Sequence, residues 1–150
     1  MPETLRNLKK ISVIGGNKIE KDGPVYQTAY QVGQLIARSG ALLVCGGLGG
    51  VMEAACRGAK DAGGITMGIL PSTDKETANP WVDLAIPTGL GYARNSLVVL
   101  SGDAVIAIDG TEGTLSEIGY AITFKKPLVG LNTWKIEPFN HQKPNLYTTA

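Results

Sequence analysis

The apolar residues of this chain fall into two alternating patterns. Short runs rich in β-branched residues are separated by longer amphipathic stretches, and this alternation is typical of parallel strands joined by crossover helices. We therefore expect an α/β fold: a single doubly wound domain with a mostly parallel six-stranded sheet and helices on both faces. The predicted strands are Ile11–Ile14, Ala41–Val44, Ile65–Leu70, Val82–Ile86, Ala104–Ile108 and Pro127–Leu131.

The amphipathic stretches predict four helices. The first begins at Pro24, which favours a first helical turn, and is ended by Gly40. The second is ended by Gly63, and after the third we expect Gly102 in the left-handed conformation that often follows a helix. The polar, proline-flanked segment 72–81 predicts a loop or a short helical turn. The expected helices span 24–40, 50–62, 92–100 and 114–124.

Length and charge limit the class of protein. The chain has 150 residues, of which 43% are apolar, and this is enough for one core but too little for two domains. We expect a domain over residues 1–131 and a polar tail over 132–150. With 14 basic and 13 acidic side chains the net charge is +1, so a nucleic-acid polymer is not an expected partner. Neither a signal peptide nor a membrane span is indicated, and we expect a cytoplasmic protein without a membrane partner.

The cysteines and the histidine do not predict a disulfide or a metal site. Cys45 and Cys56 lie inside predicted regular elements, and Cys45 is expected to act as a small buried hydrophobe rather than a ligand contact. His141 is the single histidine and lies in the tail, so no cluster has the spacing of zinc ligands. Glu53 and Arg57 form an i, i+4 pair that predicts a solvated helix face.

Glycines are concentrated where the predicted strands end. They follow four of the strands, as Gly15–Gly16, Gly46–Gly50, Gly89–Gly91 and Gly110–Thr114. The carboxyl ends of parallel strands share one edge of the sheet, and helix starts at that edge offer unpaired N–H groups that attract phosphate. A tight strand-to-helix turn needs glycine even without a ligand, but four such turns at one edge favour a site for a phosphorylated ligand.

The common nucleotide fingerprints are absent. After the first strand Gly15–Glu20 does not match G-x-G-x-x-G, and Cys45–Gly46 stand where an acidic residue would end the second strand. The chain also lacks the G-x-x-x-x-G-K-[ST] loop and the G-x-S-x-G elbow. A nicotinamide dehydrogenase and a P-loop enzyme are therefore disfavoured.

Two charged residues are expected at the same edge. Arg94 follows the third glycine turn, and its guanidinium suits a phosphate or a carboxylate, although an exposed arginine at a helix start is the alternative. Glu117 follows Thr114 by three residues, so Thr114-Leu115-Ser116-Glu117 matches a capping box in which Glu117 bonds to the start of its own helix. Catalysis by Glu117 and this capping role are compatible with each other.

The glycine motifs resemble those of a known family. The segments Gly46–Ala54 and Gly63–Pro71 resemble the LOG (Lonely Guy) family, long labelled lysine-decarboxylase-like, and most closely its molybdenum cofactor carrier branch. The similarity covers residues 11–131 and implies a Rossmann-like domain that assembles as a homodimer or homotetramer. LOG enzymes are phosphoribohydrolases that use an arginine and the glutamate of P-G-G-x-G-T-x-x-E, and the resemblance maps these onto Arg94 and Glu117.

Three positions depart from the enzyme pattern. Asp109 stands at the proline, Thr111 at the second glycine, and Asn95 at a usual lysine. Asp109 and Glu112 add negative charge beside the expected phosphate site, so the departures favour the carrier-like branch. A lysine decarboxylase is not expected, because no lysine is marked for a Schiff base to pyridoxal phosphate.

These observations predict a protein that binds a phosphorylated nucleotide-like or molybdopterin-like ligand. No cofactor is required, and the molybdenum cofactor or a nucleotide would be the bound ligand. The alternative is a phosphoribohydrolase that cleaves the N-glycosidic bond of a nucleoside monophosphate with Arg94 and Glu117. A third possibility is a sensor that contacts a partner through Trp134 and Phe139. The residues expected to form the binding site are Gly15, Gly16, Asn17, Gly46, Gly47, Gly49, Gly50, Met52, Gly91, Arg94, Asn95, Asp109, Gly110, Thr111, Glu112, Gly113 and Thr114.

Overall fold

The computed structural model describes residues 2–136 and 147–149. All the expected strands and helices are present, and α1 and β7 are additional elements. The strands are β1 (Lys10–Gly15), β2 (Leu42–Cys45), β3 (Thr66–Leu70), β4 (Leu84–Pro87), β5 (Ala104–Ile108), β6 (Leu128–Leu131) and β7 (Tyr147–Thr149). The helices are α1 (Glu3–Arg6), α2 (Pro24–Arg38), α3 (Val51–Asp61), α4 (Asn95–Ser101) and α5 (Glu112–Thr123), with 3₁₀ turns η1 (Lys75–Thr77) and η2 (Gly91–Arg94).

The strands form one sheet in the order β4-β3-β2-β1-β5-β6-β7, and every neighbouring pair is parallel. The doubly wound α/β fold is therefore confirmed. The seventh strand lies in the expected polar tail, where the backbone of β7 pairs with β6. The chain adds β2, β3 and β4 on one side of β1 and then returns to place β5 on the other side. The strand order thus reverses between β1 and β5, which is where open α/β sheets bind ligands.

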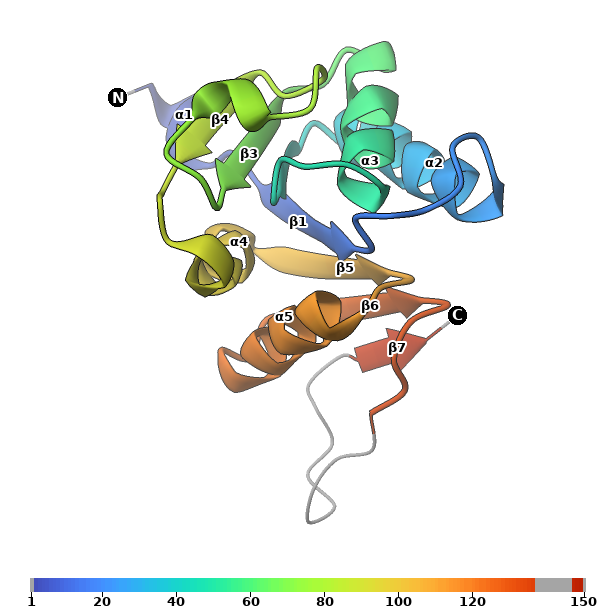
Figure 1. The fold of residues 1–150 in the computed structure, drawn as a ribbon. Coiled ribbons are helices and arrows are strands. Elements are labelled where there is room, and N and C mark those ends of the chain that lie inside the picture. Colours follow the sequence, from blue (N-terminus) through green and yellow to red (C-terminus); the bar gives the residue numbers. More distant parts are fainter. Residues whose placement is uncertain (1, 137–146, 150) are drawn as a thin grey trace.

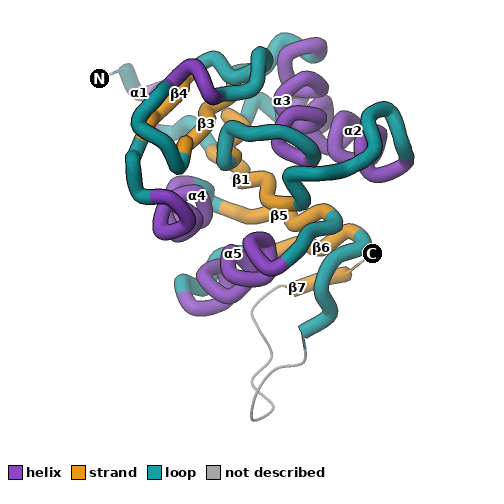
Figure 2. The backbone as a smooth tube through the Cα atoms, in the orientation of Figure 1, coloured by secondary structure: helices purple, strands orange, loops and turns teal. Residues whose placement is uncertain are grey.

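Helices cover the sheet from both sides. Helices α2 and α3 pack on one face, and α4 and α5 pack on the other (Figures 1 and 2). Neighbouring residues of β1 serve opposite faces, because Val13 packs with α2 and α3 whereas Ile14 packs with α4 and α5. Both side chains are fully buried. Within the described residues, no helix is both long enough and apolar enough to cross a membrane.

The helix ends bear out some of the sequence predictions and correct others. Gly40 and Gly63 have φ of 78°, as expected of glycines that follow a helix. The prediction for Gly102 was wrong, because its φ and ψ of −88° and 148° are extended. Glycine is needed there for a close approach instead, since a Cβ on Gly102 would collide with the Ser12 hydroxyl. The expected helix over 92–100 divides into the 3₁₀ turn η2 and helix α4.

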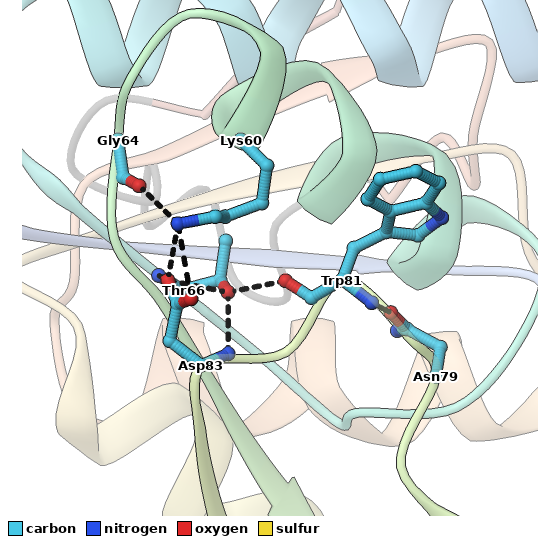
Figure 3. A network of polar contacts seen from close by, with 6 residues as sticks. All are labelled: Lys60, Gly64, Thr66, Asn79, Trp81 and Asp83. Carbon is cyan, nitrogen blue, oxygen red and sulfur yellow. Dashed lines mark hydrogen bonds and ion pairs between the residues drawn. The ribbon is translucent and has the colours of Figure 1, made fainter.

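The segment between β3 and β4 contains the short turn η1, in line with the loop or helical turn expected there. It is fastened to the domain by the polar network of Figure 3. Lys60 at the end of α3 pairs with Asp83 at 3.0 Å, and the Asp83 carboxylate accepts the Thr66 N–H at 3.0 Å. Thr66 in turn donates its hydroxyl to the Trp81 carbonyl at 2.6 Å. This network holds the chain on its way from β3 to β4.

Candidate functional site

A pocket of about 620 Å³ opens at the carboxyl edge of the sheet, at the reversal of strand order between β1 and β5. Its volume lies in the range of small-molecule sites. The residues that line it are Gly15, Asn17, Leu48, Met52, Pro71, Gly91, Tyr92, Arg94, Asn95, Thr111, Glu112, Gly113, Thr114, Ser116 and Glu117.

The structure brings most of the expected site residues to this pocket. Arg94 and Glu117 both line it, together with Gly15, Asn17, Met52, Gly91, Asn95, Thr111, Glu112, Gly113 and Thr114. The expected residues that are not among the lining are Gly16, Gly46, Gly47, Gly49, Gly50, Asp109 and Gly110. Sequence reasoning missed Leu48, Tyr92 and Ser116, each of which is adjacent in the sequence to an expected residue. It also missed Pro71, which follows β3 and has no expected residue near it in the sequence.

The turn after β2 is tied to the turn after β1. The Val51 N–H donates to the Gly16 carbonyl at 2.9 Å, and the Gly49 N–H donates to Asn17 Oδ1 at 3.0 Å. Gly50 has φ of 64°, and a Cβ there would collide with the Gly16 carbonyl. The glycines of this turn are therefore needed for two backbones to meet, and the N–H groups that make these bonds are not free to bind a ligand.

Asn79 anchors the same turn from the opposite side. Its backbone N–H donates to the Gly47 carbonyl at 2.8 Å, and its Nδ2 donates to the Leu48 carbonyl at 2.9 Å. Asn79 also accepts the Trp81 N–H at 3.0 Å, which joins the turn to the network of Figure 3. Sequence reasoning missed this residue because its partners lie about thirty positions away.

Arg94 is a buried cation beside the pocket. It ends η2 and has only 7% of its surface exposed, so the alternative of an exposed helix-start arginine was wrong. Nη2 donates to the Gly46 carbonyl at 3.4 Å, and Nη1 donates to Asn95 Oδ1. Burial lowers the pKa of Arg94, an effect that the nearby Glu117 charge opposes. Nε is buried and has no hydrogen-bond partner among the described residues, so one strong donor in the wall of the pocket is left unsatisfied.

The capping box predicted at Thr114 and Glu117 does not form. Helix α5 begins at Glu112 with Thr111 at its N-cap, three residues before the predicted N-cap, and no side chain caps it. The chain turns early because Asp109 and Gly110 have φ of 53° and 113°. Thr114 and Glu117 consequently lie inside the helix, where they are 3% and 7% exposed.

Glu117 is a buried carboxyl group in the wall of the pocket. Desolvation raises its pKa to about 8, although the positive charge of Arg94 lowers it. At pH 7 the protonated form therefore predominates, and this form can donate a hydrogen bond as well as accept one. A neutral Glu117 does not balance the positive charge of Arg94.

The start of α5 offers backbone donors to the pocket. The first hydrogen bond of the helix that reaches back four residues runs from the Leu115 N–H to the Thr111 carbonyl at 3.0 Å. The N–H groups before it have no partner within the helix, and the positive end of the helix dipole lies at the same place. Residues 111–114 line the pocket, so these donors border the same space as Arg94.

Two polar contacts hold this turn from behind. Thr133 donates its hydroxyl to the Asp109 carbonyl at 2.6 Å, and Trp134 Nε1 donates to the Thr111 carbonyl at 3.1 Å. The φ of 53° at Asp109 is one that proline cannot adopt, so this turn cannot have the backbone of the P-G-G pattern. Trp134 thus supports the pocket wall. Phe139, the other aromatic residue expected to contact a partner, lies outside the described residues, as does His141.

Two other sequence interpretations can be compared with the structure. Cys45 is fully buried, with its Sγ 3.4 Å from Cys56 Sγ, in keeping with a small buried hydrophobe. Glu53 and Arg57 are both partly exposed, in line with the expected helix face, but Arg57 also makes contacts within the domain. Its Nη1 donates to the Tyr26 hydroxyl at 3.4 Å, and its guanidinium carbon lies 5.6 Å from the centroid of the Trp81 ring.

Comparison with known proteins gives consistent relatives. The chain matches the SLOG cluster4 family over residues 8–149. The molybdenum cofactor binding protein from Rippkaea orientalis has a TM-score of 0.79 and 46% identity over 86% of this chain and 78% of its own. For the molybdenum cofactor carrier protein from Chlamydomonas reinhardtii, the TM-score is 0.77 and the identity 36%, over 85% of this chain and 79% of its own. A cytokinin riboside 5'-monophosphate phosphoribohydrolase from Mycobacterium tuberculosis is 35% identical over 72% of this chain, which spans 63% of that protein.

Proposed function

Because this chain belongs to the SLOG cluster4 family, near the molybdenum cofactor carrier branch of the LOG-like superfamily, we propose that it binds a phosphorylated nucleotide-like or molybdopterin-like ligand in the pocket between β1 and β5. The proteins from Rippkaea and Chlamydomonas support the molybdenum cofactor as the ligand class. The ligand is then the cargo of the protein, and no resident cofactor is required.

The observation that carries this proposal is the unpaired Nε of Arg94. Arg94 is 7% exposed, and a buried guanidinium that lacks a partner for one N–H is energetically costly. A phosphate oxygen in the pocket would satisfy that donor and would neutralise the charge. The start of α5 at residues 111–114 would supply backbone N–H groups to the same phosphate.

In this proposal the two glycine turns predicted from the sequence, at 46–50 and at 110–114, have different roles. The Gly49 N–H of the turn at 46–50 is bonded to Asn17, and the Val51 N–H that follows the turn is bonded to Gly16. The role of this turn in the proposal is therefore to shape the wall of the pocket. The turn at 110–114 leads into α5 and is the proposed phosphate site. The carboxylates of Asp109 and Glu112 make no contact with the phosphate in this proposal, because they would repel it.

The phosphoribohydrolase reading remains the alternative. Arg94 and Glu117 line one pocket, and the mycobacterial relative is named as such an enzyme. In that reading Arg94 holds the 5'-phosphate while Glu117 orients water and stabilises the positive charge that develops on the sugar. Only an ionised carboxylate stabilises such charge, and the pKa of about 8 leaves Glu117 mostly neutral at pH 7. The electrostatics of the pocket therefore favour binding over hydrolysis.

Calorimetric titration with AMP and with a pterin phosphate tests the binding proposal. We expect at least one of them to bind the wild-type protein saturably and to bind Arg94→Ala at least tenfold more weakly, since a charge-assisted contact is lost. Arg38→Ala is the matched control, because Arg38 is exposed at the end of α2 and away from the pocket. Absence of binding to the wild-type protein, or equal binding to both variants, would contradict the proposal.

Release of free adenine from AMP separates the two functions. The binding proposal predicts no adenine above the blank from a protein that binds AMP. Release by the wild type that is abolished in Glu117→Gln would establish the hydrolase instead.

We also propose a homodimer or homotetramer in the cytoplasm, as the resemblance to the LOG family implies. Native mass spectrometry measures the number of chains, and a monomer at micromolar concentration would contradict this part of the proposal.

A further inference from the structure

The lining of the pocket divides into an apolar end and a polar end. The strand order β3-β2-β1-β5 places Pro71 and Leu48, which follow β3 and β2, toward one end. Residues 111–117, which follow β5, lie toward the other end. Polar groups predominate there, whereas Leu48, Met52 and Pro71 give the opposite end an apolar wall.

Tyr92 belongs to the apolar end. The Gly91 N–H donates to the Pro71 carbonyl at 3.0 Å, and this bond fixes the start of η2 beside the end of β3. Two residues later the same short turn delivers the buried Arg94. One 3₁₀ turn therefore carries both an aromatic ring and a cation to a single pocket.

The exposure of Tyr92 is unusual for a residue in a pocket wall. Tyr92 is one of the residues that line the pocket, yet 88% of its surface is exposed, which is the largest exposed fraction among the large hydrophobic residues that the structure describes. Within the described part of the chain its hydroxyl makes no hydrogen bond and its ring has no aromatic partner. A ring that gains so little from the protein around it is available to a ligand.

We propose that Tyr92 is the stacking platform for the planar heterocycle of the ligand, with Leu48 and Pro71 beside it. This inference rests on the proposed function. The phosphate lies toward the start of α5 and on Arg94, whose guanidinium is close to Gly46 and Met52 and also interacts with Glu117. A flat ring with an apolar face and a phosphate on a short linker matches this division of the pocket. The ligand class is thus a purine or pterin phosphate rather than a bare sugar phosphate.

Three ligands that all carry a phosphate, two of them with a planar heterocycle and one without, test the platform. Dissociation constants are measured by calorimetry for AMP, a pterin phosphate and ribose 5-phosphate. Ribose 5-phosphate keeps the phosphate but lacks the planar heterocycle. We expect Tyr92→Ala to weaken the tighter of the two heterocyclic ligands about tenfold, the loss typical of one base–aromatic stack. The affinity for ribose 5-phosphate should change less than twofold. Tyr92→Phe should bind the heterocyclic ligand as tightly as the wild type does, because phenylalanine retains the aromatic ring.

The fluorescence of the pterin phosphate gives a second readout. Stacking on an aromatic ring should quench it with the wild type and with Tyr92→Phe, and the quenching should be lost in Tyr92→Ala. Tyr120→Ala is the matched control, because Tyr120 is also partly exposed but stacks on Phe124 and does not line the pocket.

The possible failures are distinguishable. Equal weakening of ribose 5-phosphate and the heterocyclic ligands in Tyr92→Ala would overturn the platform, and so would unchanged binding of all three. Both results would leave the phosphate site on Arg94 intact. If none of the three ligands binds the wild-type protein, the proposed function fails and the platform fails with it.

Discussion

Arg94 and Asn95, neighbours in the sequence, are joined by a hydrogen bond from the guanidinium Nη1 to the amide Oδ1. Asn95 then donates Nδ2 to the Ser116 hydroxyl at 3.3 Å, and Ser116 donates to the Gly113 carbonyl at 2.6 Å. This chain of bonds connects the buried cation to the first turns of α5. It fixes one end of the guanidinium, while Nε has no hydrogen-bond partner among the described residues.

The first prediction concerns Asn95, which stands where the phosphoribohydrolases usually carry lysine. Lysine is a donor only, so it could not accept the Arg94 bond. We therefore expect Asn95→Lys to weaken ligand binding about tenfold. Asn95→Ala should lower the free energy of unfolding by about 1–2 kcal/mol, since a buried hydrogen bond is lost. Calorimetry and urea denaturation measure the two effects. Asn7→Ala, at an exposed site, is the control, and unchanged binding in Asn95→Lys would show that the link to α5 does not position Arg94.

The second prediction is a pH dependence of stability that depends on Glu117. Burial raises its pKa in the folded protein to about 8 from an ordinary value of 4.5, so the folded state holds the proton more tightly than the unfolded state. Stability from this group is therefore fully present below pH 4.5 and is lost as the pH rises toward 8, at a limiting slope of about 1.4 kcal/mol per pH unit.

Urea denaturation between pH 5 and pH 8.5 measures this slope. Glu117→Gln should remove the contribution, while Glu76→Gln, at an exposed position, should keep it. A wild-type protein and a Glu117→Gln variant with the same pH dependence would contradict the raised pKa.

The third prediction compares two glycines with positive φ. Gly50 and Gly63 have φ of 64° and 78°, but a Cβ on Gly50 would meet the Gly16 carbonyl whereas one on Gly63 meets nothing within 4 Å. Gly63→Ala should cost about 1–2 kcal/mol for the left-handed conformation alone. Gly50→Ala should cost about 1–3 kcal/mol more because the two turns must separate. Denaturation of both variants checks this difference, and equal costs would show that the contact between the turns is not tight.

The fourth prediction concerns Cys45 and Cys56. Both thiols are buried, and the pKa of Cys56 is raised well above its ordinary value by its hydrogen bond to Cys45 and by burial. Neither thiol should react with Ellman's reagent on a time scale of minutes in the folded protein, and both should react after denaturation. Rapid release of even one equivalent of thionitrobenzoate from the folded protein would show that the end of β2 opens readily.

The fold could be predicted from the sequence because its signals are local. Runs such as Ala104–Ile108 have a composition that parallel strands share, and Pro24 and Gly40 mark the ends of α2 directly. Arg94 and Glu117 could also be predicted as pocket residues, since each follows a glycine turn that comes after a predicted strand. Their burial did not follow, because it results from packing between β2, α4 and α5.

The start of α5 was predicted wrongly for a physical reason. The sequence Thr114-Leu115-Ser116-Glu117 is a valid capping signature. The left-handed turn at Asp109 and Gly110 nevertheless starts the helix before that signature is reached. Asn79 could not be identified either, because its importance arises only when β3 and β2 lie side by side.

The central claim is that a phosphate is held between Arg94 Nε and the first turn of α5. A crystal structure of the protein soaked with its tightest ligand among AMP, the pterin phosphate and ribose 5-phosphate tests it most directly. The account predicts a phosphate oxygen within about 3.2 Å of Arg94 Nε and of at least one backbone N–H of residues 111–114. A ligand bound elsewhere, or a phosphate that leaves Arg94 Nε unpaired, would contradict it.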